Sequence, residues 1–250
     1  MKHSNCLNCE KPVENNFCSH CGQRTHTHRM TLKHFFLHDL VHGVWHLERG
    51  IVFTLLETLR RPGQAALEYL SGKRIRYYNV FYLILLVIAA NAALIHFYDK
   101  FLPVDTEEIP PFAQFIQNNI KYILIGWVPF LAFNGYLIMD RMRLNMIEHF
   151  IVCGISLLGT LLFCIPWFFI DFLIDYGYDF RAMKLLQAAV ALAVLFYPVW
   201  TYVNAAGKFY KWWEYLWRFM VFYTILFAEF IAFLLLVVLC SGGLSQLAQK

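Results

Sequence analysis

The chain has 250 residues, of which 59% are hydrophobic, 18% aromatic and only 15% charged, and its formal net charge is +4. Soluble proteins carry about 25% charged residues, so this composition excludes a disordered protein, a small disulfide-rich secreted scaffold and a protein built on a basic nucleic-acid-binding tail. It predicts an all-α polytopic membrane protein.

The start of the chain, residues 1–24, is predicted to be a zinc ribbon. Its cysteines have the spacing C-x2-C-x8-C-x2-C: Cys6, Cys9, Cys18 and Cys21. A C-x-x-C turn directs two thiolates to one ion, and Gly22 permits the tight turn after the second pair. Two disulfides or a redox pair are the alternatives, but a reducing cytosol disfavours the first and the second belongs with an α/β pattern that this sequence lacks. Because thiolates fill all four positions, the Zn²⁺ is predicted to be structural.

Residues 25–78 are predicted to form amphipathic interfacial helices and a basic elbow. Four histidines recur at every fourth position, so on a helix they share one face, opposite an apolar face: His34, His38, His42 and His46. One hypothesis is that this face binds a second metal ion or senses pH, because imidazole titrates near pH 6.5. The simpler interpretation, which we favour, is a polar face at the membrane surface.

The elbow contains two further helical stretches, Ile51 to Leu59 and Ala65 to Leu70, separated by Pro62 and Gly63. Basic residues flank this break and precede the first long apolar segment: Arg60, Arg61, Lys73, Arg74 and Arg76. Such cations beside aromatic residues suit anionic lipid headgroups, although an ordinary anchor at the membrane surface has the same composition.

Five apolar segments are long enough to cross a bilayer core of about 30 Å as helices. They define a predicted transmembrane domain at 79–240, followed by a tail at 241–250, and they lie near 79–98, 121–139, 149–170, 185–203 and 219–240. With the N-terminus in the cytoplasm, 16 of the 21 Lys and Arg residues lie on the cytoplasmic side, as the positive-inside rule requires. The sequence therefore predicts five crossings, N-in and C-out. The alternative is four crossings and a re-entrant segment at 121–139, which contains Pro129 and Asn134.

Two polar residues lie near the middle of predicted crossings, Asn91 in the first and Glu229 in the last. A protonated Glu229 bonded to Asn91 or to a tyrosine would join helices, and the alternative is a proton or cation site on a transport path. At the start of the third crossing, Glu148 and His149 are predicted to form interfacial salt bridges with the arginines of the preceding loop, in preference to a catalytic pair.

The predicted ribbon, which ends CSHCGQ, and three stretches after it together resemble a known family. The stretches are Leu47 to Gly50, Leu55 to Gly63 (LLETLRRPG) and Tyr69 to Asn79 (YLSGKRIRYYN). Over residues 6–86 the chain resembles an uncharacterised, Bacteroidota-like family of bacterial membrane proteins of unknown function with an N-terminal zinc ribbon. The resemblance implies zinc and the bacterial inner membrane, and supplies no activity. Family members follow a Glu-His pair with further histidines in a later crossing. This chain keeps Glu148 and His149 without those histidines, which weakens a metal or catalytic role for the pair.

The sequence contains none of the motifs G-x-S-x-G, H-E-x-x-H, P-loop or G-x-G-x-x-G, so no catalytic residue is assigned and an enzyme is not indicated. The preferred hypothesis is an integral inner-membrane docking or accessory subunit, surrounded by membrane lipids, that binds a protein partner on the cytoplasmic side or within the bilayer. A small transporter or lipid-handling protein using Glu229 and Asn91 is the second hypothesis, and a membrane enzyme using the histidine helix is the third. Nucleic acid binding is disfavoured because the ribbon is short and its neighbouring charges are mixed.

Overall fold

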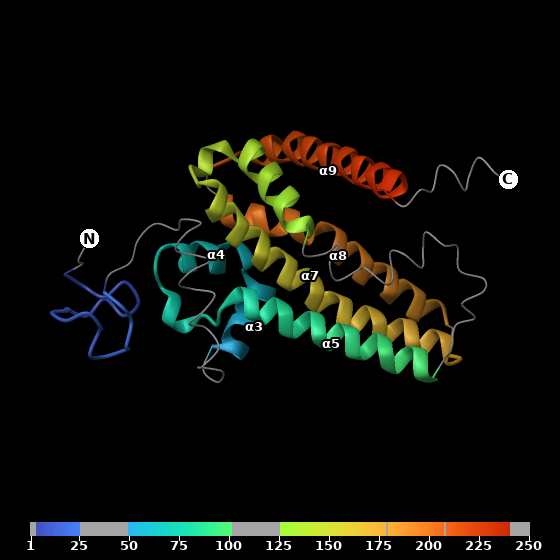
Figure 1. The fold of residues 1–250 in the computed structure, drawn as a ribbon, viewed down its shortest axis with the longest axis horizontal. Coiled ribbons are helices and arrows are strands. Elements are labelled where there is room, and N and C mark those ends of the chain that lie inside the picture. Colours follow the sequence, from blue (N-terminus) through green and yellow to red (C-terminus); the bar gives the residue numbers. More distant parts are fainter. Residues whose placement is uncertain (1–3, 26–49, 102–125, 179, 208, 241–250) are drawn as a thin grey trace.

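The computed structural model describes residues 4–25, 50–101 and 126–240, apart from 179 and 208. Within these ranges the chain forms helices and two isolated antiparallel bridges, and no strand (Figure 1). The prediction of an all-α fold is confirmed for this part of the chain. The predicted histidine helix and the C-terminal tail lie outside the described residues and stay predictions.

Four of the described helices, α5, α7, α8 and α9, are long and apolar enough to cross a membrane. In chain order the described elements are α3 Ile51–Arg60, α4 Pro62–Leu70, the 3-10 helix η3 Arg74–Arg76, α5 Val80–Phe101, the helix Gly126–Ile138, the 3-10 helix η5 Asp140–Met142, α7 Met146–Asp175, α8 Arg181–Ala206 and α9 Trp212–Cys240. The long helices extend beyond the predicted segments at most of their ends.

The helix Gly126–Ile138 is the described part of the predicted second crossing. At 1.5 Å per residue it is about 20 Å long, which is shorter than a bilayer core of about 30 Å. Residues 121 to 125 of that segment lie outside the described ranges. Four membrane-long helices are therefore established, and the fifth crossing stays a prediction.

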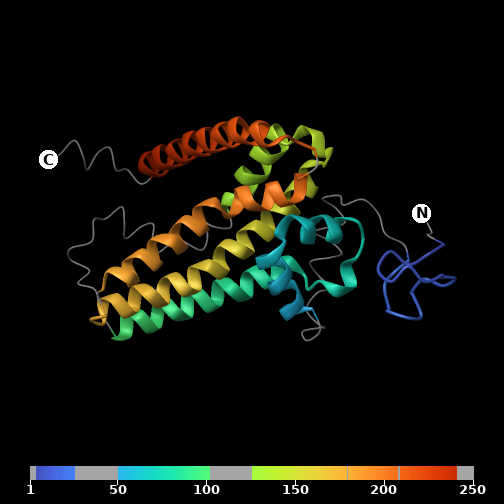
Figure 2. The same ribbon diagram turned by 180° about the vertical axis from the view of Figure 1, so that it is seen from behind.

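Successive helices alternate in direction (Figures 1 and 2). The helices α5, α7 and α9 begin at the end of the bundle where Gly126–Ile138 and α8 finish, and α3, α4 and the cysteine-bearing segment lie at that same end. We call this the proximal end. It gathers the elbow and the loops at 139–145 and 207–211, which are the basic segments that the sequence assigns to one side of the membrane.

The centre of the bundle is α7, which packs against α5 on one side and α8 on the other (Figure 1). Small residues on α7 permit close approach, since Gly154 lies against Val80 and Ile84 of α5, and Gly159 lies beneath the ring of Tyr197 of α8. Membrane helices associate through such close packing, because lipid removes the hydrophobic drive that brings helices together in water.

The short helix α4 packs against the proximal ends of both α7 and α8. Pro62 opens the helix at a position where its missing N–H costs nothing. Gly63 meets the backbone of α8 directly, beside Thr201 and Ala205. Gln64 fixes the register, because its backbone N–H donates to the Asn204 side chain at 2.9 Å and its own amide donates to the Asn204 carbonyl at 2.8 Å.

We expect Gly63→Ala to destabilise the protein. A Cβ at this position would overlap the Ala205 nitrogen and the Thr201 carbonyl oxygen, and backbone atoms of a packed helix cannot move aside as a flexible side chain can. Overpacking of this kind costs about 1–3 kcal/mol or more, so the melting temperature in detergent should fall by several degrees.

Gly126→Ala is the matched control, because a Cβ there meets no atom within 4 Å and alanine favours a helix over glycine. Its melting temperature should stay the same or rise. Equal melting temperatures for the two variants would contradict the close contact between α4 and α8.

Candidate functional site

The four cysteines of the N-terminal segment form a compact sulfur cluster. All four Sγ atoms lie within 4.8 Å of one another, with Cys6 and Cys21 at 3.5 Å and Cys9 and Cys18 at 3.6 Å. Tetrahedral zinc with Zn–S bonds of about 2.3 Å places its sulfurs about 3.8 Å apart. The cluster therefore fits one tetrahedral metal ion, as the spacing predicts.

Two similar turns build this cluster. In the first, the N–H of Glu10 donates to the Cys6 carbonyl at 2.8 Å, and in the second the N–H of Gly22 donates to the Cys18 carbonyl at 2.9 Å. Both residues that close the turns have positive φ, 63° at Glu10 and 77° at Gly22. Glycine adopts this conformation without strain, so the predicted role of Gly22 fits its geometry.

The backbone around Cys18 favours its thiolate. The N–H of Cys21, then that of His20, and the neighbouring thiols of Cys9 and Cys21 lower the pKa of Cys18 to about 7, although burial acts in the opposite direction. Metal ions bind the thiolate and not the thiol, so this turn is electrostatically prepared for a cation.

The cysteine module, residues 4–25, is attached to the elbow by hydrogen bonds. Arg76 donates through Nε to the Asn8 side chain at 2.8 Å and through a terminal nitrogen to the Asn8 carbonyl at 3.3 Å. The N–H of Ile75 donates to the side chain of Gln23 at 3.0 Å, and Gln23 is only 4% exposed. The sequence analysis missed Asn8, which lies inside the first cysteine turn, and Gln23, which follows the second turn by two residues.

A carboxylate of α4 holds the elbow together. Glu68 lies 3.3 Å from Arg61 and 3.6 Å from Arg76, and it accepts a hydrogen bond of 2.9 Å from the Tyr77 hydroxyl. Arg61 also pairs with Glu57. Burial alone would lower the pKa of Arg61, but the two carboxylates raise it above its ordinary value.

These contacts bear on the basic residues that the sequence assigns to lipid headgroups. Arg61 and Arg76 are engaged by carboxylates of the elbow, and the guanidinium of Arg74 lies 5.7 Å from the centre of the Tyr69 ring. Arg60 is exposed and Lys73 is half-buried. Headgroup binding by this group stays a prediction, and two of its members have a structural role in the protein itself.

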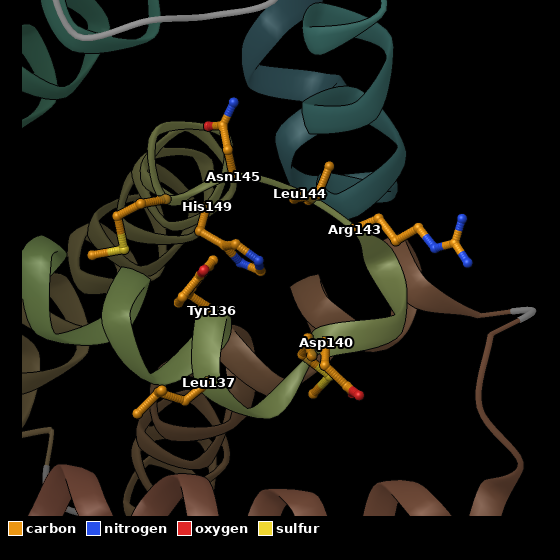
Figure 3. Close-up of a pocket in the computed structure, with 9 residues that line it drawn as sticks. Tyr136, Leu137, Asp140, Arg143, Leu144, Asn145 and His149 are labelled. Carbon is orange, nitrogen blue, oxygen red and sulfur yellow. The ribbon is translucent and has the colours of Figure 1, made fainter.

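Glu148 and His149, the predicted interfacial pair, have different surroundings in the structure. Glu148 and Asn145 form a capping box at the start of α7, with reciprocal bonds of 2.7 and 2.9 Å. His149 is only 1% exposed, and its Nδ1 lies 3.1 Å from the hydroxyl of Tyr202, which also lies 3.2 Å from the Cys153 sulfur. The α7 helix thus turns the ring of His149 toward Tyr202 of α8 and not toward the arginines of the preceding loop, one of which, labelled in Figure 3, points away from the ring.

Ion pairs connect the 139–145 loop with α9. Arg141 pairs with Glu214 at 2.8 Å. The buried Arg218 donates to the carbonyl of Ile138 and lies 3.2 Å from Asp140. Sequence reasoning gave Arg218 no role beyond a loop charge, because its partners become neighbours only when α9 folds back onto the loop.

The two intramembrane polar residues have separate partners, so the bond between Glu229 and Asn91, one of the two alternatives for Glu229, is not formed. Asn91 donates to the Val87 carbonyl at 2.8 Å and to the Leu161 carbonyl of α7 at 3.2 Å. Glu229 accepts a bond of 2.8 Å from Asn134, which is fully buried in the helix Gly126–Ile138. Each residue joins two helices, through partners that the sequence analysis did not name.

We expect the purified protein to contain one tightly bound metal ion per chain at the cysteine module. The variant Cys18→Ser should lose this ion. A serine hydroxyl stays protonated at neutral pH and is a poor substitute for a thiolate. Elemental analysis of the purified peak measures the stoichiometry. Cys164→Ser is the control, since this half-buried cysteine of α7 lies outside the cluster and should leave the metal content unchanged. Equal metal content in the two variants would contradict the site.

Comparison with known proteins finds a family match for one part of the chain. No curated protein and no solved structure matches it. Residues 48–90 match the family described as Protein of unknown function (DUF3667). The described part of that stretch comprises α3, α4, η3 and the first half of α5, which is the elbow with its Glu68 ion pairs and its contact with α8. Over these residues the chain is similar to a family whose function is unknown.

Proposed function

We propose that this protein is an integral membrane docking or accessory subunit, and that the cysteine module binds a protein partner on the cytoplasmic side. The observation that carries the proposal is the attachment of the module to the bundle. The bonds of Asn8 and Gln23 to η3 give the module a defined position at the proximal end. A rigid recognition element binds at a lower entropic cost than a tethered one.

Structural zinc is the ion that best suits this module. Four thiolates with near-tetrahedral spacing leave no position for a catalytic water, and such closed sites stabilise small folds. Twenty-two residues are described in this segment, residues 4–25, with two isolated bridges as their regular structure. A unit this small generally needs a metal or disulfides to fold.

The outer face of the module offers a surface for a partner. Phe17 is 54% exposed, and the guanidinium of Arg24 lies 5.6 Å from the centre of its ring. Beside them is a shallow cavity of about 530 Å³ whose lining includes Glu14, Asn15 and Asn16. An exposed aromatic residue beside an arginine is the composition of many protein-binding hot spots.

The proximal end is proposed to face the cytoplasm of a bacterial cell, with the C-terminus in the periplasm. Three features support this orientation: the basic elbow and loops share one end of the bundle, free thiols suit a reducing compartment, and the helices alternate in direction (Figure 1). The host membrane is then the bacterial inner membrane.

Phe17→Ala should remove the partner while the metal site stays intact. Loss of a hot-spot aromatic side chain weakens an interface by about tenfold or more. The measurement is quantitative mass spectrometry of proteins that co-purify from the native host in mild detergent. Lys11→Ala, an exposed substitution in the other cysteine turn, is the control and should keep the partner. A stoichiometric partner that persists with Phe17→Ala, or no such partner of the unaltered protein, would contradict the docking function.

A second prediction tests the orientation and the number of crossings together. With small epitope tags before Met1 and after Lys250, protease added outside spheroplasts should remove the C-terminal tag and leave the N-terminal tag, because five crossings place the termini on opposite sides. In inverted vesicles the pattern should reverse. Both tags on one side would instead support four crossings and a re-entrant segment.

A further inference from the structure

The cysteine module consists of two halves, residues 4–13 and 16–25, each of which carries one C-x-x-C turn. An isolated antiparallel bridge closes each half on itself, and these bridges join Asn5 to Pro12 and Phe17 to Arg24. The backbone hydrogen bonds of each cysteine turn also stay within its own half. The two halves meet at their sulfur atoms, which lie within 4.8 Å of one another. A metal ion bound by all four thiolates would therefore join the halves.

The short helix η3 of the elbow contacts both halves. Arg76 donates to the Asn8 side chain of the first half at 2.8 Å. The N–H of Ile75 donates to the Gln23 side chain of the second half at 3.0 Å. The Ile75 side chain also lies against Gly22, where an added Cβ would approach its Cδ1 to 3.3 Å. Because Ile75 and Arg76 are adjacent, both bonds require the two halves to keep this relative position.

Metal occupancy and attachment to η3 therefore depend on each other. The ion fixes the distance between the halves, because Zn–S bonds of about 2.3 Å hold four sulfurs in one tetrahedron. Without the ion, the sulfurs have little to hold them together, since a thiol is a weak donor and a weak acceptor. Linkage is reciprocal: if bound metal favours the attachment by some factor, the attachment favours metal binding by the same factor.

The contacts of η3 continue to the start of the first long helix. Three residues separate η3 from α5. The first of them, Tyr77, donates to Glu68 at 2.9 Å, and Glu68 also lies 3.6 Å from Arg76. The N–H of Tyr78 donates to the buried Thr54 side chain of α3 at 2.8 Å. The sulfur cluster is therefore connected through η3 to the elbow and to the beginning of α5 by a continuous series of contacts.

We propose that the cysteine module is a metal-dependent latch on η3. With one ion bound, the two halves are held where Asn8 and Gln23 meet Arg76 and Ile75. When the ion is lost, the halves separate, these bonds break and η3 is released. The proposal rests on the metal site of the proposed function and not on the protein partner, whose binding the latch would make dependent on metal occupancy.

The first test compares amide hydrogen exchange in the metal-loaded, full-length protein in detergent with exchange after a chelator has removed the metal under reducing conditions. The peptide covering residues 71–79 should exchange about fivefold faster without metal, because the Ile75 N–H loses its acceptor. Residues 151–159 of α7, which are buried in the bundle, are the internal control and should keep their exchange rate. Elemental analysis of both samples measures the metal content.

The second test breaks the contacts with η3 and leaves every cysteine in place. The double variant Asn8→Ala with Gln23→Ala removes the side-chain acceptors of Arg76 and Ile75. By reciprocity its metal affinity, measured by competition with a chromogenic chelator, should fall about tenfold, since two hydrogen bonds are lost. Its η3 peptide should exchange fast even with metal bound. Ser19→Ala, an exposed substitution inside the second cysteine turn, is the control and should behave like the unaltered protein.

Equal exchange of the η3 peptide with and without metal would overturn the latch, and a loaded metal site in that protein would leave structural zinc and the docking function standing. Faster exchange of α7 as well would show unfolding of the bundle in place of a local release. Unchanged metal affinity of the double variant would show that the attachment does not favour the bound ion. A protein that binds no metal at the module would contradict the metal site itself, and the latch with it.

Discussion

The close contact between α4 and α8 is the constraint on which the proximal end depends. Gly63 brings the start of α4 against the α8 backbone, and Gln64 bonds to Asn204 on the next turn. With α4 fixed there, Glu68 is held where it reaches Arg76 and Tyr77. Arg76 in turn holds the cysteine module, so one backbone contact helps to position the described segments that precede the first long helix, residues 4–25 and 50–79.

Carboxylates at the proximal end organise the basic residues in two places. Glu68 gathers the arginines of the elbow, and Asp140 and Glu214 gather those of the 139–145 loop and α9. These ion pairs lie at the end of the bundle. Water and lipid headgroups there keep the charges partly solvated, which reduces the desolvation cost of each pair. The basic residues on which the predicted orientation rests therefore also join the elements of the proximal end.

The sulfur cluster is a closed site, because its four ligands would complete the coordination of one ion. Such a site is suited to stabilising a small fold. The stretch that matches the DUF3667 family follows the cluster in the chain, as the elbow that attaches the cysteine module to the bundle.

The sequence by itself determined the features that depend on local pattern. Apolar length indicated the four membrane-long helices, C-x-x-C spacing indicated the metal cluster, and Pro62 marked the end of α3, although α4 begins at Pro62 itself and includes Gly63. Only the tertiary structure decided the partners of the polar residues. Asn134 and Glu229 are 95 residues apart in the chain, and His149 and Tyr202 are 53 apart. A hydrophobic pattern specifies which residues enter the bilayer and not which helices become neighbours, since an apolar face packs as readily against lipid as against another helix.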